Sequence, residues 1–209
     1  MFYFVRSMRL FLVAAFCLVS LTSCGGLAKQ DQKALFTLPE GKRVLVLVDV
    51  RPSVGVPPEF ATQLGQSISD KLWNWNAVSG GGAMVPQTRI LELKKDASAF
   101  AQMGIADVAM AADADVVLHL DIVGFSVSAL SDDSITQGGA QTLVKVVDRD
   151  GTRLWPTATM GTLVEVSIAP AFSEQRNRAG VQKEIIDLLA IRTARMFIKY
   201  RLDDPKIAR

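Results

Sequence analysis

The side chains of this chain that could perform chemistry are few and lie far apart in the sequence. His119 is the only histidine, so a Ser-His-Asp catalytic site would have to use it. Because His119 stands inside an apolar run, we interpret it as a buried residue held by one hydrogen-bond partner. Asp113, Asp115 and Asp121 offer oxygen ligands of the kind that Mg²⁺ and Ca²⁺ prefer, but their spacing is not that of a metal-binding loop. The sequence therefore predicts no catalytic residue, no metal and no other cofactor.

Two glycine-containing stretches hold parts of ligand-binding loops without completing them. Ser79–Gly82 could cradle a phosphate, but it follows a predicted helix and lacks the lysine and hydroxyl of a P-loop. Asp148–Gly151 holds part of a calcium-loop pattern and lacks its later ligands. We interpret the first stretch as a flexible connection and the second as a hairpin turn.

The first residues of the chain have the features of a secretory signal peptide. Arg6 and Arg9 make the N-terminus basic, and no acidic residue accompanies them. The 12 residues Leu10–Leu21 are apolar apart from Ser20, fewer than the roughly 20 residues that a membrane-spanning helix needs. A basic start, a short apolar segment and small residues after it indicate export.

The segment LTSC, residues 21–24, resembles the lipobox of bacterial lipoproteins, in which two small residues separate an aliphatic residue from a cysteine. The resemblance implies cleavage between Ser23 and Cys24 and attachment of lipid to the Cys24 thiol. Cys17 fits this pattern less well, because a phenylalanine precedes it. An uncleaved anchor helix with an incidental cysteine is the alternative.

Lipid on Cys24 would hold the mature chain on a membrane, facing the periplasm, because two or more acyl chains anchor a protein firmly. In lipoproteins of this kind an aspartate after the cysteine retains the protein in the inner membrane. Gly25 occupies that position here, which favours the outer membrane.

The composition changes once the signal peptide is set aside. Residues 1–23 carry two of the 23 basic residues and none of the 21 acidic ones, so the remaining 186 residues hold 21 of each. A balanced chain without a clustered basic face gives no support for binding nucleic acid. Cys24 is the one cysteine left, so no disulfide can form within the mature chain, and its stability must come from a hydrophobic core.

The pattern of apolar residues predicts one α/β domain over residues 42–202, preceded by a lipidated tether at 24–41 and followed by a tail at 203–209. Continuous apolar runs indicate strands covered on both faces, and shorter alternating runs indicate the others. The predicted strands are 44–48, 83–90, 116–123, 143–147, 152–155 and 162–168. The predicted helices are a 17-residue helix opened by Pro57-Pro58, then 91–103, 105–112 and a long closing helix, 174–202, with a polar loop at 131–139. This order predicts a mixed sheet of about five strands with helices packed on it.

Two tryptophans near the end of the first helix differ in their expected environment. Trp75 continues the apolar stripe formed by Phe60, Leu64, Ile68 and Leu72, so we expect it in the core. Trp73 lies off that stripe and near the glycine-rich loop, which makes it a candidate contact for a partner protein. Core packing of Trp73 is the alternative.

Four stretches carry a resemblance to known envelope domains: KRVLVLVDVRP, LGQSISDKLW, AADADVVLHLDIVGF and VKVVDRDGTRLW. They resemble the first strand, first helix, helix-to-strand passage and hairpin of the TolB amino-terminal domain. Curli-secretion (CsgG-type) lipoproteins and lipoprotein activators of penicillin-binding proteins have similar periplasmic domains. The resemblance covers residues 42–202 and departs from the pattern at Ala111-Ala112, where a glycine is usual.

The resemblance implies a non-catalytic module that acts by protein contacts in cell-envelope assembly or maintenance, so we expect no enzyme activity. The alternative is an accessory or oligomeric subunit of an envelope secretion or transport complex. Curli-type pores use long membrane-inserting hairpins, for which 124–140 and 156–170 are the candidate segments. A spanning strand needs about 9–11 alternating residues, and only 162–168 approaches that, so we expect no pore. The partner and the oligomeric state are not defined by the sequence.

Overall fold

The computed structural model describes residues 31–130, 135–157, 160–169, 177–202, 204 and 207. The chain divides into two compact units, residues 34–198 and a smaller unit formed by the two chain ends. The predicted signal peptide, the cleavage between Ser23 and Cys24 and the lipidation of Cys24 lie outside the described residues. Among the residues that the structure describes, no helix is both long and apolar enough to cross a membrane.

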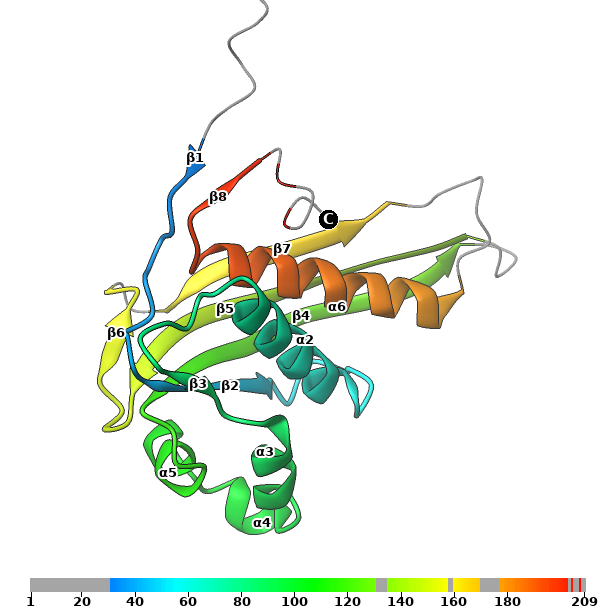
Figure 1. The fold of residues 1–209 in the computed structure, drawn as a ribbon. Helices are drawn as coiled ribbons and strands as arrows, with labels where there is room; N and C mark the ends of the chain where they lie inside the picture. Colours follow the sequence, from blue (N-terminus) through cyan, green and yellow to red (C-terminus); the bar gives the residue numbers. More distant parts are fainter. Residues whose placement is uncertain are drawn as a thin grey trace, which may run out of the picture. The chain divides into compact units, whose positions relative to one another are not determined.

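The larger unit is built on a six-stranded mixed sheet (Figure 1). The strand order is β3-β2-β4-β5-β6, and β7 also pairs with β5. β2 is parallel to β3 and β4, whereas β5 is antiparallel to β4, β6 and β7. The strands are β2 (Arg43–Val50), β3 (Ala83–Met84), β4 (Val116–Leu130), β5 (Ile135–Asp148), β6 (Arg153–Trp155) and β7 (Thr162–Ile168). The prediction of a mixed sheet with helices packed on it is confirmed.

Helices cover the two faces of this sheet differently (Figure 1). The long helices α2 (Phe60–Asn74) and α6 (Arg178–Arg195) pack against each other and against one face. The short helices α3 (Gln87–Leu93), α4 (Ala97–Phe100) and α5 (Ile105–Ala111) lie on the other side, near β2. There they form a hydrophobic cluster with Leu45, Leu47 and Val117. This two-sided cover explains why β2 is a continuous apolar run, since each buried Val or Leu contributes about 1.5–3 kcal/mol.

The segment after the glycine-rich loop differs from the prediction. The strand predicted at 83–90 is only Ala83–Met84, because Pro86 ends it and stands at the N-cap of α3. The helix predicted at 91–103 is divided between the end of α3 and the short α4, whose cap Asp96 accepts a hydrogen bond from the Ala99 backbone. Pro86 and the Asp96 cap therefore set the boundaries here, where the apolar pattern was weak.

A side chain closes part of the free edge of β2. The Nε2 of Gln87 donates a hydrogen bond of 2.8 Å to the Val46 carbonyl, although β3 pairs only with Arg43 and Val44. Gln87 is buried against Gly65 of α2, where a Cβ would approach its Oε1 to 2.8 Å. The amide therefore takes the place of a neighbouring strand along this stretch.

The hairpin of β4 and β5 is longer than predicted, because residues 135–139 of the predicted polar loop are strand. Gly138 and Gly139 suggested a loop, but they permit close packing. A Cβ at Gly138 would lie 3.0 Å from side-chain atoms of both Ile185 and Val181 in α6, and one at Gly139 would lie 2.9 Å from the Val166 carbonyl. Tertiary packing therefore overrides the low strand propensity of glycine.

The last helix is shorter than predicted, since α6 spans Arg178–Arg195 rather than 174–202. Asn177 caps it by accepting a hydrogen bond from the Gly180 backbone at 2.8 Å. After the helix the chain forms β8 (Tyr200–Arg201).

The smaller unit is a short strand pair. β1 (Asp31–Gln32) is antiparallel to β8, and the Nζ of Lys199 lies 2.8 Å from a carboxylate oxygen of Asp31. The Lys199 ammonium holds the pKa of Asp31 below its usual value. Residues 34–41, which the sequence assigned to the tether, belong to the larger unit, with Leu38 buried and the Phe36 ring 6.1 Å from that of Trp155.

Candidate functional site

His119 is a buried residue with one partner, as the sequence indicated. Its side chain is 7% exposed, and its Nε2 lies 2.7 Å from the Oδ2 of Asp49 on the neighbouring strand β2. Its Nδ1 has no hydrogen-bond partner among the described residues. The Asp49 side chain is 45% exposed, so the pair sits at the border between the core and solvent.

The three aspartates that could have formed a metal site are separated by the structure. Asp115 accepts a hydrogen bond of 2.9 Å from the Arg43 backbone at the start of β2, and Asp121 pairs with Arg51 at 2.9 Å farther along the sheet. Asp113 pairs with the Arg43 guanidinium instead. Over the described ranges, no group of three His, Cys, Asp or Glu side chains is placed to hold a metal ion.

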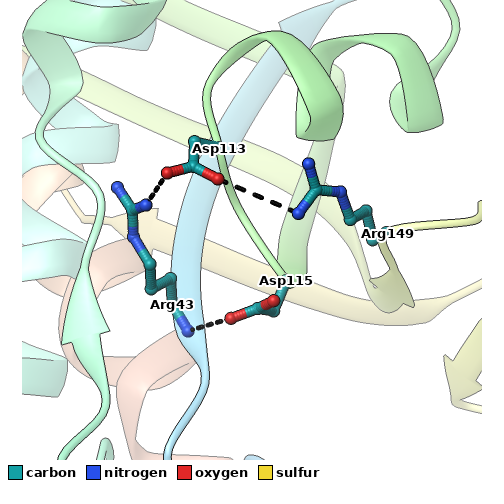
Figure 2. Close-up of polar contacts among 4 residues, drawn as sticks. All are labelled: Arg43, Asp113, Asp115 and Arg149. Carbon is teal, nitrogen blue, oxygen red and sulfur yellow. Dashed lines mark hydrogen bonds and ion pairs between the residues drawn. The ribbon is translucent and has the colours of Figure 1, made fainter.

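Asp113 is the centre of an ion-pair cluster that joins three segments (Figure 2). One carboxylate oxygen pairs with Arg43, and the other lies 3.8 Å from Arg149 in the turn after β5. Asp113 adopts a left-handed backbone conformation, with φ of 53°, which aspartate tolerates better than most residues. Because the charges of the cluster pair with one another and the cluster lies at the start of β2 and β4, we interpret it as a structural contact that holds these segments together.

The predicted hairpin turn at Asp148–Gly151 is confirmed. A carboxylate oxygen of Asp148 accepts hydrogen bonds from the backbone of Asp150 at 3.0 Å and of Thr152 at 2.9 Å. An aspartate bonded to the backbone that follows it is a common way to fix a turn. This contact accounts for the acidic residue without a calcium ion.

The outer parts of β4, β5 and β7 have one face that packs on α2 and α6 and one face that does not. Phe125 points to the helices, because its ring centroid lies 4.8 Å from that of Phe60 in α2. Strand alternation then places the neighbouring residues on the opposite face. We call this surface the open face; its residues are Gly124, Ser126, Ser128, Gln137, Gly139, Gln141, Glu165 and Ser167.

The open face is shallow, polar and nearly free of charge. Its small side chains leave a hollow of about 420 Å³ over the three strands. The Nε2 of Gln141 donates to a carboxylate oxygen of Glu165 at 3.1 Å, so the one acidic group of the surface is held across β5 and β7. Leu163, on the same side of β7, is 53% exposed. Such a surface offers side-chain amide and hydroxyl groups to a partner.

Sequence reasoning missed the open face, although one signal was present. The alternation of small polar and apolar residues over 124–129 indicates a half-covered strand rather than the end of one. The face also depends on β7 lying beside β5, and a long-range pairing of this kind is not visible in a local pattern.

Trp73 lies at the C-terminal end of α2 and is 55% exposed, whereas Trp75 is half-buried. Lys71 lies 5.8 Å from the centroid of the Trp75 ring. The exposure of Trp73 leaves its indole accessible, and its role as a partner contact stays a prediction. Trp73, Asn74, Asn76 and Val78 line a hollow of about 300 Å³.

No protein-family model matches the chain, and no curated protein matches its sequence. Among solved structures, it is similar to the PelC dodecamer from Paraburkholderia phytofirmans, with 11% identity and a TM-score of 0.43 over 83% of this chain and 99% of that one. It is also similar to lipoprotein GNA1162 from Neisseria meningitidis, with 14% identity and a TM-score of 0.41 over 73% and 96%. A hypothetical protein, CT253 from Chlamydia trachomatis, has 11% identity and a TM-score of 0.41 over 74% and 97%. These values do not assign the chain to a family.

Proposed function

We propose that this chain is a lipid-anchored envelope protein that acts through contact with another protein and catalyses no reaction. The observation that carries the proposal is the open face, a broad sheet surface that α2 and α6 leave uncovered and that displays hydrogen-bonding groups. A typical protein interface carries about ten direct hydrogen bonds, and the amide and hydroxyl side chains of the open face can supply some of them.

The placement of the reactive side chains supports a role without catalysis. His119 is hydrogen-bonded to Asp49 at the edge of the core. Each of the three candidate aspartates contacts the side chain or the backbone of an arginine. A general base or nucleophile needs access to the reacting group at about 2.6–3.2 Å. The described geometry offers no such arrangement around His119.

The anchor follows from the sequence rather than from the described residues. Lipid on Cys24 would be separated from β1 by residues 25–30, which reach about 20 Å when fully extended. The described part of the chain would therefore begin close to the membrane, on its periplasmic side. Gly25 after the cysteine supports the outer membrane.

The packing of the long hairpin favours this module over a membrane-inserting subunit of a secretion complex. The apolar side of the outer β4 and β5 arms contacts protein, because Phe125 packs on Phe60 and Gly138 lies against Val181 and Ile185. A lipid-facing hairpin would instead turn its apolar side outward.

Intact mass spectrometry of the membrane-extracted protein tests the anchor. We expect a wild-type chain that starts at Cys24 and carries acyl mass, and we expect both features to be lost in Cys24→Ser. A chain that keeps Met1–Ser23 in both samples would contradict lipidation and would require a short uncleaved anchor.

Position-specific crosslinking in living cells tests the interaction surface. A photo-reactive amino acid at Ser126 or Ser167 places the probe on the open face, and one at Gln63 places it on the exposed side of α2 as the matched control. We expect one protein partner to be crosslinked from both open-face positions and not from Gln63. Equal crosslinking from all three positions, or none from the open face, would reject this surface.

A further inference from the structure

The end of α2 is a rigid corner with a defined hydrogen-bond pattern. The Ala77 backbone donates to the Leu72 carbonyl at 2.9 Å, and the Asn76 backbone donates to the Trp73 carbonyl at 3.1 Å. Asn76 has φ of 56°, in the left-handed region. Together these features form a Schellman cap, which satisfies the last carbonyls of the helix.

The Asn76 side chain is exposed and takes no part in the hydrogen bonds of the cap, which join backbone groups. Glycine is the usual residue at this position because it has no Cβ, and asparagine is the usual substitute. The next two residues, Ala77 and Val78, are buried and fix the chain beyond the corner. The exposed side chains of Trp73, Asn74 and Asn76 are therefore displayed from a backbone that is held at both ends.

These side chains line one concave surface. The hollow of about 300 Å³ that they form with Val78 is at the small end of the range for ligand sites, about 300–1,000 Å³. Trp73 contributes an aromatic surface that is half open to solvent, and the two asparagines contribute amides. An amide offers both donors and an acceptor.

The chemistry of the lining selects the class of ligand. No charged residue is among the four that line the hollow, and a helix C-terminus disfavours an anion. A matching ligand is neutral, has one apolar face to lie on the indole and has groups at its edge that both donate and accept hydrogen bonds. A sugar ring has this combination, with axial C–H bonds on its face and hydroxyls around its edge.

We propose that the corner at the end of α2 binds a neutral saccharide, with the indole of Trp73 against the face of a sugar ring and the amides of Asn74 and Asn76 bonded to its hydroxyl or acetamido groups. This site is separate from the open face and does not depend on the lipid anchor. It gives Trp73 a glycan ligand in place of the protein contact expected from the sequence.

Nuclear magnetic resonance titration of the full mature chain, residues 24–209 with Cys24→Ser, tests the proposal. The probes are maltose and the disaccharide of N-acetylglucosamine. We expect at least one of them to shift the indole N–H signal of Trp73 with a Kd on the order of 1 mM, as befits a small ligand on a shallow site. The indole signal of Trp155, which packs on Phe197, should not move.

Matched variants separate binding from folding. Trp73→Ala should weaken saccharide binding by about tenfold or more. Trp73→Phe should retain part of the binding, because it keeps an aromatic ring against the sugar face. Asn76→Gly keeps the left-handed backbone and so keeps the cap, yet removes an amide, and should weaken binding severalfold without lowering the unfolding midpoint. Leu91→Ala, at an exposed position on α3, should change neither quantity.

Four results would overturn the proposal. One is the absence of any Trp73 shift at saccharide concentrations of about 20 mM, far above the expected Kd. Another is an unchanged Kd in both Trp73→Ala and Asn76→Gly. The third is tighter binding of an acidic sugar, such as glucuronic acid, than of neutral ones. The fourth is protein crosslinking from Trp73 without saccharide binding.

Discussion

At the scale of single residues, the pair of His119 and Asp49 shows how one polar side chain is accommodated in a β-strand core. The imidazole is buried, while the carboxylate that holds it reaches solvent. The pair therefore stabilises the fold mainly by giving the buried imidazole a partner, because a buried donor without one costs about 1–3 kcal/mol.

We expect Asp49→Ala to lower the free energy of unfolding by about 1–3 kcal/mol, because it leaves Nε2 of His119 unpaired. Urea unfolding at neutral pH measures the change. Asp121→Ala is the control: it removes a carboxylate on the adjacent strand that pairs with the exposed Arg51, and it should cost less than about 1 kcal/mol. Equal losses in the two variants would show that burial of His119 is not the cause.

The second residue-scale prediction concerns Asp31. Its hydrogen bond and ion pair with Lys199 lower its pKa from the usual 3.8. A lowered carboxylate pKa stabilises the folded state above the unfolded pKa, and that contribution is lost as the pH falls through the folded one. Lys199→Gln should return the carboxyl pKa towards 3.8, as followed by the carboxyl carbon shift of Asp31 between neutral and acidic pH. A titration curve unchanged by the substitution would show that Lys199 is not the cause.

At the scale of elements, the strands that were predicted well are those with strong local patterns. The apolar run of β2 and the alternation of β7 each define a strand without help from neighbours. The stripe of α2 likewise defined the helix and its buried residues. The start of β5 was not predictable in this way, because two glycines lower its strand propensity and only contact with α6 and β7 explains them.

Gly138→Ala tests this account of β5. The added Cβ would lie 2.9 Å from the Ser126 carbonyl and 3.0 Å from Ile185, so we expect a loss of about 1–3 kcal/mol in the free energy of unfolding. Gly55→Ala is the matched control, since no atom lies within 4 Å of the added carbon. A stable Gly138→Ala would mean that α6 does not pack as closely as described.

The candidate sites show the same difference between features set by local sequence and features set by distant contacts. The burial of His119 and the turn at Asp148 followed from local context, and the structure confirms both. The separation of Asp113, Asp115 and Asp121 depends on arginines that are distant in the sequence. Arg43 and Arg51 lie 70–72 positions from the aspartates they contact, and Arg149 belongs to a different turn. No spacing rule reveals these contacts. The open face required knowledge of which strand lies beside β5.

At the scale of the whole molecule, the two units differ in what holds them. The larger unit has a core covered from both sides of β2, whereas the pair of β1 and β8 has two residues in each strand and an exposed ion pair. Regions with few buried contacts open at a lower free energy than the core does.

Hydrogen exchange measured by mass spectrometry should therefore separate the units. We expect backbone amides of β1 and β8 to exchange within seconds to minutes by local opening, and those of β2 and the first half of β4 to exchange only by global unfolding. Addition of urea below the transition should accelerate the second group more than the first. Equal protection of both groups would show that the chain ends open only together with the core.

Gln87 has a consequence for how this protein behaves at high concentration. An unpaired strand edge is a template on which another chain can add, and β2 is apolar from Val44 to Val48. The Gln87 amide occupies the Val46 carbonyl and so removes one of the groups that a second chain would use. Gln87→Leu would keep the volume and free that carbonyl. Light scattering on warming should then report aggregates at temperatures where the wild-type chain stays monodisperse. The solubility of the chain would then depend on a single amide that no surface survey would identify, because it is buried.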